Sequence, residues 1–437
     1  MEGKVLTAHR ASILHFLADP EKVLPDESYQ YFEDGILLVE DGKVHTLGHS
    51  EDLLADLDAS VEIHHHQNCL LLPGFVDTHI HYPQTEMIAA YGEQLLEWLE
   101  KYTFPTEAQF GDKDYAGDIA ERFLDELLRA GTTTALVFGT VHEASVDAFF
   151  EACEKRNLRM IAGKVMMDRN APDYLTDTPE SSYIESKALI EKWHKRGRLQ
   201  YAVTPRFAPT SSDEQLQRAG QLMEEYPDVY LHTHLSENPD EIAWVSKLFP
   251  DSVNYLDTYD TAGLLGRRSI FAHCIHLSDE EWSRMAETRS GIAFCPTSNL
   301  FLGSGLFPLG RAVKQDINVG LGTDVGGGTS FSLLQTLNEA YKVLRSRGEQ
   351  LSPFKGFYLA TLGGAKTLDL TQYIGNFEHG KEADFVVLDK ACTPLMEFRM
   401  SKCKSLFEEL FVFSMLGDDR AIRQTWSAGV RVHDREQ

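Results

Sequence analysis

Histidines and carboxylates with the spacing of metal ligands occur at several points of the 437-residue chain. His79 and His81 lie two residues apart in an apolar segment, and in a β-strand that spacing points both rings to the same side. An HxH pair alone is more often packed than metal-bound, but His234, His273 and Asp324 end three other apolar segments. Imidazole nitrogens with one carboxylate, and a position left for water, form the ligand set of a catalytic zinc site. The expected metal ligands are His79, His81, His234 and Asp324.

Glu237 and His273 are the candidates for proton transfer. Glu237 follows His234 by three residues, so its carboxylate can reach a metal-bound water and carry a proton to a ring nitrogen of a substrate. The sequence from Glu237 is also typical of a helix N-terminus, and both roles are compatible. Four protein ligands leave only the water position, so His273 is expected to contact that water and to orient it together with Asp324. The expected catalytic residues are Glu237, His273 and Asp324.

The elements that must position these residues are short strands alternating with helices. Between about residues 74 and 376, short apolar segments alternate with longer amphipathic ones, which predicts parallel βαβ units. The predicted strands are 70–81, 133–138, 160–167, 201–207, 229–234, 270–273, 292–295 and 319–323. They predict an α/β fold, a (β/α)8 TIM-type barrel, whose strand ends meet at one mouth where active sites lie. Polar loops after strands explain a residue such as Asp168, but they explain three histidine-bearing strand ends poorly.

The sequence favours one metal ion over two. Dinuclear hydrolases with such a barrel place a modified, bridging lysine at the end of the fourth strand. Here that strand runs into Arg206, whose guanidinium is not deprotonated in proteins and cannot bridge two metals. Lys164 lies on the third strand and is interpreted as an ion-paired residue. One ion per chain is therefore expected: Zn²⁺, with Fe²⁺ or another divalent ion as the alternative.

Both ends of the chain predict β-structure, and the composition limits the partners. Residues 36–39 and 44–47 flank Asp41-Gly42, a strong hairpin signal, while 384–388 and 430–432 are short β-branched runs. The chain has 41 Lys and Arg against 67 Asp and Glu, a net charge of −26, which disfavours nucleic acids and anionic membranes. A small-molecule substrate fits this charge.

Several features indicate the cytoplasm. No apolar run approaches the ~18 residues needed to cross a bilayer, and the first residues lack the apolar stretch and cleavage site of a secretory signal. The six cysteines are scattered and form no CxxC pair, which argues against a disulfide framework.

Five motifs resemble those of the metal-dependent amidohydrolase superfamily. They are PGFVDTHIH at 73–81, HTHLSE at 232–237, AHC at 272–274, CPTSN at 295–299 and GTD at 322–324. GKEADFVVL at 380–388 is similar to the segment by which this superfamily returns to a small β-sandwich begun at the N-terminus. The resemblance implies a discontinuous β-sandwich from residues 1–73 and 377–437, with the barrel at 74–376.

Within this superfamily the chain resembles the guanine deaminase family over effectively its whole length. The resemblance rests on YPQ at 82–84, LLEWLEKYTFPTE at 95–107, TPRFAPT at 204–210 and NLFLGSG at 299–305. It implies hydrolysis of guanine to xanthine and ammonia, a zinc ion, a homodimer and a cytoplasmic role in purine salvage. A metal-activated water would attack C2 of guanine while Glu237 protonates N3.

A guanine pocket needs a few fixed polar groups and flat apolar walls. The Gln84 amide can both donate and accept at the purine edge, and Arg206 offers donors to the ring carbonyl, although it could instead form a salt bridge. Trp98 and Phe104 are better interpreted as core residues than as ring walls. The substrate contacts that the resemblance implies are Gln84, Arg206, Phe207, His234 and Glu237.

Other functions stay open at this point. Another mononuclear aminohydrolase of the superfamily could act on triazines, adenosine derivatives or 8-oxoguanine, although Gln84 and Arg206 favour guanine. A non-catalytic scaffold, built on a barrel that has lost its catalytic function, is disfavoured because the expected metal ligands, Glu237 and His273 are all present. The HxE…PCxxC signature of a different class of zinc deaminases is absent.

Overall fold

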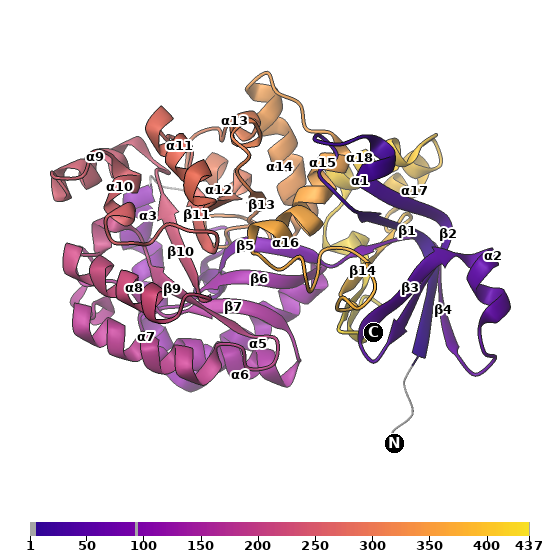
Figure 1. Ribbon diagram of the computed structural model, residues 1–437, viewed down its shortest axis with the longest axis horizontal. Coiled ribbons are helices and arrows are strands. Elements are labelled where there is room, and N and C mark those ends of the chain that lie inside the picture. Colours follow the sequence, from indigo (N-terminus) through magenta and orange to yellow (C-terminus); the bar gives the residue numbers. More distant parts are fainter. Residues whose placement is uncertain (1–5, 92–94, 437) are drawn as a thin grey trace.

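The computed structural model describes residues 6–91 and 95–436, and they form two lobes side by side (Figure 1). In the larger lobe, parallel strands pair in the order β5-β6-β7-β9-β10-β11-β12-β13, and β8 pairs with β9. These strands are β5 (Phe75–His81), β6 (Thr132–Phe138), β7 (Arg159–Gly163), β8 (Val165–Met166), β9 (Gln200–Pro205), β10 (Tyr230–Leu235), β11 (Ser269–His273), β12 (Gly291–Phe294) and β13 (Val319–Leu321). The predicted (β/α)8 barrel is confirmed.

Helices follow the strands and surround the barrel (Figure 1). The longer ones are α5 (Lys113–Arg129), α6 (Glu143–Lys155), α7 (Pro179–Trp193), α8 (Asp213–Glu225), α9 (Pro239–Leu248), α11 (Asp279–Thr288) and α14 (Leu333–Ser346). Shorter ones are α3 (Leu95–Trp98), α4 (Phe104–Glu107), α10 (Tyr255–Asp260), α12 (Pro296–Phe301), α13 (Leu309–Lys314), α15 (Pro353–Tyr358) and α16 (Gly364–Thr367). In α5, Asp112 caps the N-terminus, and buried Ala116, Ile119 and Phe123 recur at helical spacing.

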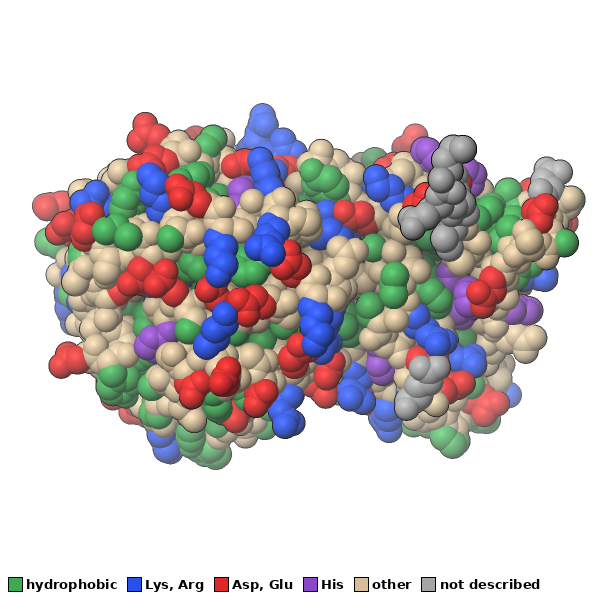
Figure 2. Space-filling model, turned by 90° about the horizontal axis from the view of Figure 1, so that it is seen from below, with side chains coloured by type: hydrophobic (Ala, Val, Ile, Leu, Met, Phe, Trp, Pro, Cys, Tyr) green, Lys and Arg blue, Asp and Glu red, His purple; other side chains and the backbone are tan. Residues whose placement is uncertain are grey.

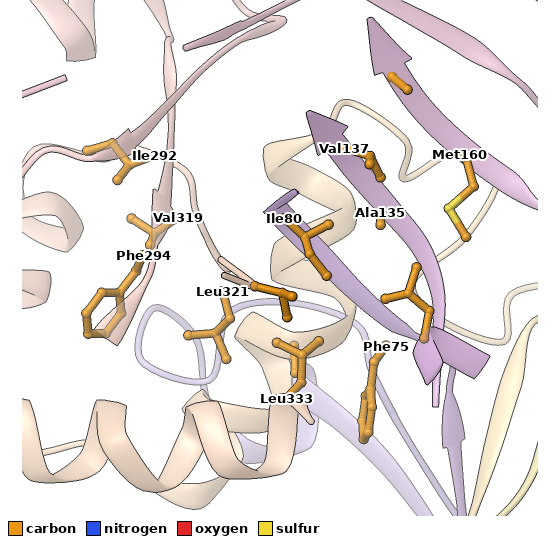
Figure 3. Close-up of a cluster of buried hydrophobic side chains, with 14 of the residues drawn as sticks. Phe75, Ile80, Ala135, Val137, Met160, Ile292, Phe294, Val319, Leu321 and Leu333 are labelled. Carbon is orange, nitrogen blue, oxygen red and sulfur yellow. The ribbon is translucent and has the colours of Figure 1, made fainter. Parts of the chain in front are cut away.

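Alternate residues of the barrel strands enter two separate cores. Ala135 and Val137 of β6 point outwards and belong to the same buried cluster as Leu321 of β13 and Leu333 of α14, part of which is drawn in Figure 3. Leu136 lies between them in sequence and points into the barrel, where it belongs to a different apolar cluster. Because side chains of a strand alternate between its two faces, the barrel interior is a packed core rather than a pore.

The first and last barrel strands meet through isolated hydrogen bonds rather than through a regular ladder. Thr78 Oγ1 of β5 donates to the carbonyl oxygen of Leu321 at 2.9 Å. The Asp324 N–H donates to the carbonyl oxygen of His79, also at 2.9 Å. These contacts nearly close the barrel and bring the end of β13 against the HxH segment of β5.

Two of the predicted strands are divided in the structure. The segment 70–81 is two strands, because β4 (Glu62–Pro73) belongs to the smaller lobe and β5 to the barrel. Gly74 joins them where the chain passes so close to β6 that a Cβ would lie 2.1 Å from Thr133 Oγ1. The segment 160–167 is likewise divided into β7 and β8 at Lys164.

The smaller lobe is a mixed sheet built from both ends of the chain. Its order is β16-β15-β14-β4-β1-β2-β3. The strands not yet named are β1 (Leu6–Phe16), β2 (Tyr29–Glu40), β3 (Lys43–His49), β14 (Phe385–Asp389), β15 (Ile422–Ser427) and β16 (Val430–Asp434). The predicted hairpin is confirmed: β2 and β3 are antiparallel, and Asp41 (φ 51°) and Gly42 (φ 78°) form the left-handed pair of a tight turn.

This sheet curves over an apolar core of its own. Val44 of β3 and Trp426 of β15, from opposite ends of the sheet, both contribute to that core. The β2–β3 turn therefore meets the β15–β16 turn, and a Cβ on Gly42 would lie 2.6 Å from the carbonyl oxygen of Ala428. Small helices α1 (Pro25–Ser28) and α2 (Ser50–Leu53) contact β2 of this sheet, whereas α18 (Leu406–Leu416) packs with α17 (Pro394–Met400) and with α14 and α15 of the larger lobe.

A buried ion-pair network ties the two lobes together. Arg198, in the loop before β9, and Arg159, at the start of β7, both donate to the Glu382 carboxylate. Arg198 also pairs with Asp384, which precedes β14. The side chains of both arginines are less than a tenth exposed, so their charges depend on these carboxylates.

The surface mixes both signs of charge despite the acidic total. Figure 2 shows Lys and Arg side chains interleaved with Asp and Glu across one face. Across the described ranges, no helix combines the length and apolarity that crossing a bilayer requires.

Candidate metal centre and active site

The four expected metal ligands converge at the mouth of the barrel. The Nε2 atoms of His79 and His81 are 3.2 Å apart, and each lies 3.2–3.3 Å from Oδ1 of Asp324. His234 offers a nitrogen within 4.8 Å of nitrogens of the other two histidines. All four residues come from the ends of β5, β10 and β13 or from the residues just after them. The arrangement could hold one metal ion between three imidazoles and a carboxylate.

Hydrogen bonds on the far side of two rings fix which nitrogen faces this centre. His234 Nδ1 donates to the carbonyl oxygen of Arg206 at 2.7 Å, so Nε2 is free to bind a metal. His79 Nδ1 shares a 2.7 Å hydrogen bond with Nε2 of His232, which leaves His79 Nε2 facing the cluster. His232 was not predicted as a site residue, although its place two residues before His234 in the sequence puts both rings on one side of the strand.

The protonation states suit a metal site. Burial lowers the pKa of His81 to about 3, and it also lowers the pKa values of His79 and His234, so the rings are neutral at physiological pH. Burial alone would raise the pKa of Asp324, but His79, His81 and His273 hold it well below its ordinary value. Neutral imidazoles beside an ionised carboxylate are the states in which these residues bind metals, so the residues fit the expected ion.

The backbone at the strand ends is strained. His273 (φ 73°), Ser236 (φ 48°) and Asp324 (φ 51°) occupy the left-handed region, which costs a non-glycine residue roughly 1–3 kcal/mol. Asp77 helps to hold the turn at Asp324, because its buried carboxyl accepts hydrogen bonds from the N–H groups of His79 and Thr323 at 3.1 Å. Tertiary contacts thus impose conformations that the local sequence does not prefer.

Glu237 and His273 lie beside the metal centre. Glu237 Oε2 is 3.4 Å from His273 Nε2, and Glu237 Oε1 accepts a hydrogen bond from Ser304 at 2.8 Å. Burial and the charge of Asp324 raise the pKa of Glu237 to about 8. His273 Nδ1 donates to Oδ1 of Asn299 at 2.8 Å, which turns Nε2 towards Glu237. A carboxyl with a pKa near neutrality can both accept and donate a proton.

A cavity opens over this centre. The metal-centre residues that line it are His81, His234, Glu237, His273 and Asp324. Gln84, Arg206 and Phe207 line it as well, so the residues expected to contact substrate face the same space as three of the four expected metal ligands. Trp98 lines the cavity and also packs in the apolar cluster above the mouth, whereas Phe104 lies in that cluster beneath Arg206.

Other polar residues noted in the sequence have structural contacts. Lys164 is buried and ion-paired with Asp177 and Glu185, which confirms its interpretation as an ion-paired residue. Asp168 accepts a hydrogen bond from the N–H of Ser212, at the start of α8.

Three residues at the site were not assigned from the sequence. Ser304, Glu107 and Asn299 lie in the matching segments 299–305, 95–107 and 295–299. Each acts on another side chain far away in sequence: Ser304 on Glu237, Asn299 on His273, and Glu107 on Arg206. Their place in motifs that match the family could have indicated a role at the site, but the sequence does not show which side chains they contact.

Comparisons with known proteins agree with this architecture. The model of the family described as Amidohydrolase family matches residues 70–432, and this family is generally metal-dependent. Guanine deaminase of Escherichia coli (strain K12) is 58% identical over 417 residues, which cover 95% of this chain and 94% of that protein.

Solved structures give the same result. The structure of E. coli guanine deaminase matches with a TM-score of 0.95 and 55% identity, covering 98% of this chain and 99% of that one. Guanine deaminase from C. acetobutylicum, with guanine bound in its active site, matches with a TM-score of 0.88 and 31% identity, covering 98% and 100%. The chain therefore belongs to the amidohydrolase family and, within it, to the guanine deaminases.

Proposed function

We propose that this protein hydrolyses guanine to xanthine and ammonia. The observation that carries the proposal is a single cavity lined both by a His and Asp cluster suited to a metal ion and by Gln84 and Arg206, which suit a purine edge. Relatives with the same overall fold are guanine deaminases, and one of their structures holds guanine in its active site.

We propose that His79, His81, His234 and Asp324 hold one Zn²⁺ per chain. The support is the convergence of three neutral imidazoles and an ionised carboxylate, the donor set of mononuclear catalytic zinc sites. Fe²⁺ or another divalent ion accepts the same donors. When bound there, such an ion supplies Lewis-acid chemistry, lowering the pKa of a water molecule towards about 7.

The chain's own residues then move the protons. Glu237 takes a proton from the attacking water and delivers it to N3 of guanine, while the water oxygen adds to C2. The amino group leaves C2 as ammonia after a second proton transfer, and the carbonyl of xanthine forms. His273 Nε2, 3.4 Å from Glu237 and 3.8 Å from Asp324, orients the water with Asp324 and shares in these transfers.

The cavity walls hold the purine in place. Gln84 and Arg206 contact its polar edge, and Phe207 offers a flat apolar surface, with Trp98 and Leu302 completing the walls. His234 and Glu237 contact the reacting end. A planar, neutral base with a dense polar edge matches this combination.

We further propose a homodimer. Leu395 and Phe398 of α17 and Phe407 of α18 have exposed fractions of 63, 64 and 49%, an unusual concentration of apolar surface on two adjoining helices. A second copy of the chain would cover this face. Analytical ultracentrifugation should show a dimer that Phe398→Glu together with Phe407→Glu converts to monomer; a monomeric unsubstituted protein would contradict the proposal.

We also propose a cytoplasmic role in purine salvage. All six cysteines are free, as expected in a reducing compartment.

The function is tested by ammonia release from purified protein of known metal content. Guanine, adenine, cytosine and a triazine are assayed in parallel. Rapid release from guanine alone, with about one metal ion per chain, is the expected result. Release only from another substrate would retain the metal site and overturn the guanine assignment, and no release from fully metallated protein would favour a non-catalytic scaffold.

A further inference from the structure

Glu107 lies buried between the two residues proposed to contact the purine edge. Its carboxylate accepts from Arg206 Nη1 at 2.8 and 3.0 Å and from Gln84 Nε2 at 3.1 Å. The Glu107 side chain is 1% exposed and that of Arg206 4%. Glu107 does not itself line the cavity, so any effect on a ligand must pass through Gln84 and Arg206.

The contact with Glu107 decides which way the Gln84 amide faces. A carboxylate can only accept, so the nitrogen of the amide must face Glu107 and the oxygen must face away. That oxygen, Oε1, lies beside Gly326, where a Cβ would come within 2.4 Å of it. It accepts no hydrogen bond from the described residues, and Gln84 lines the cavity, so Oε1 is available to a ligand donor.

The N–H groups of the Arg206 guanidinium are likewise shared between Glu107 and the cavity. Nη1 is committed to Glu107, and the remaining guanidinium N–H groups donate to no other described residue. These groups can only donate, so Arg206 presents donors to the cavity that it lines.

We propose that Glu107 is a positioning residue that sets the hydrogen-bond polarity of the pocket, one acceptor from Gln84 beside donors from Arg206. This inference rests on the proposed function and names its specificity. The ligand class is a purine with a 6-oxo group beside N1–H, because its acceptor and donor complement Arg206 and Gln84. A 6-aminopurine has a donating amino group at C6 and an accepting N1, so it would place a donor against Arg206 and an acceptor against Gln84 Oε1. A buried polar site rejects a ligand that leaves its hydrogen-bonding groups unpaired.

The first test compares two substrates that carry the same 2-amino group. Guanine has the 6-oxo edge, whereas 2,6-diaminopurine has the inverted edge. In Glu107→Gln, the new amide can donate or accept, so both orientations of Gln84 become available. We expect kcat/KM for guanine to fall about 100-fold and its preference over 2,6-diaminopurine to fall at least about 30-fold, as for loss of a charged hydrogen bond.

A matched control is Glu100→Gln, which makes the same change at an exposed position of the same segment. It should leave both rates unchanged. A role for Glu107 in folding alone would lower both rates in Glu107→Gln by the same factor and leave the preference intact, and that result would overturn the proposal.

A binding measurement separates this inference from the proposed activity. Hypoxanthine has the 6-oxo edge but no 2-amino group to lose, and adenine has the inverted edge. Calorimetric Kd values should favour hypoxanthine in the unsubstituted protein, and Glu107→Gln should lose that preference. If guanine is not hydrolysed but this binding pattern holds, the proposed function fails and the inference about Glu107 stands. If guanine is hydrolysed and Glu107→Gln keeps the preference for hypoxanthine, the proposed function stands and the inference about Glu107 is overturned.

A second variant covers the case in which Glu107→Gln does not fold. Gln84→Met removes the amide but leaves the Arg206–Glu107 pair intact. It should fold with normal metal content and lose the preference for hypoxanthine by at least about 10-fold, as for loss of one hydrogen-bonded partner. An unchanged preference in a folded Gln84→Met would equally overturn the proposal.

Discussion

Replacing Glu237 by Gln should slow turnover greatly without disturbing the fold. The amide has the shape of the carboxyl group and its oxygen can still accept the hydrogen bond from Ser304, which is 2.8 Å long in the native protein. The substitution removes only the ability to take up and release a proton. We therefore expect unchanged metal content and an unchanged melting temperature.

The size of the loss follows from what surrounds Glu237. A positioned acid–base group contributes about 10²–10⁴ in rate. Asp324, the nearby carboxylate, is held ionised by the histidines around it, so it cannot donate in place of Glu237. His273 Nε2 is 3.4 Å from Glu237 and can replace only part of the proton transfer. We expect kcat to fall about 10³-fold, or about 4 kcal/mol in activation free energy.

The assay is ammonia release from guanine under saturating substrate, with metal content and unfolding temperature measured on the same sample. Ser304→Ala is the companion variant: it removes one hydrogen bond to Glu237 and should cost no more than about 10-fold. A Glu237→Gln enzyme within 10-fold of the native rate would refute the reasoning. A variant that loses its metal would show instead that Glu237 acts as a ligand.

Three further changes should have measurable effects. Asn299→Ala releases His273 from its 2.8 Å hydrogen bond and should lower kcat/KM by about 10–100-fold with metal retained; an unchanged rate would mean that packing alone orients the ring. Glu382→Ala leaves buried guanidinium charge at Arg198 without one of its partners and should lower the free energy of unfolding in urea by about 3–5 kcal/mol, whereas a loss below about 1 kcal/mol would contradict the proposed lobe contact. Burial and neighbouring charges lower the pKa of His66 in β4 to about 4, so the folded protein keeps this ring neutral where an unfolded chain would protonate it. The free energy of unfolding should therefore be highest above pH 6.5 and fall by about 3 kcal/mol as the pH is lowered towards 4. His66→Gln should make the free energy of unfolding depend less on pH over this range, and the same pH dependence in both proteins would contradict the assignment.

The strands that carry the site could be predicted because their patterns are local. Short apolar segments alternating with amphipathic ones gave the barrel, and the spacing of His79 and His81 placed both rings on one face. The division of 70–81 into β4 and β5 could not be predicted in the same way. Both halves are buried, and only the close approach of Gly74 to β6 shows where one sheet ends and the other begins.

The sequence by itself determined the residue types at the strand ends, and with them the donor set, the acid–base group and the charge of the protein. The tertiary structure decided which of these groups act on one another. Glu107 meets Gln84 and Arg206 from positions 23 and 99 residues away, and Asn299 meets His273 across 26. The physical reason is that a ligand's identity depends on the chemistry of one side chain, whereas its orientation and protonation depend on partners that only folding brings within hydrogen-bond distance.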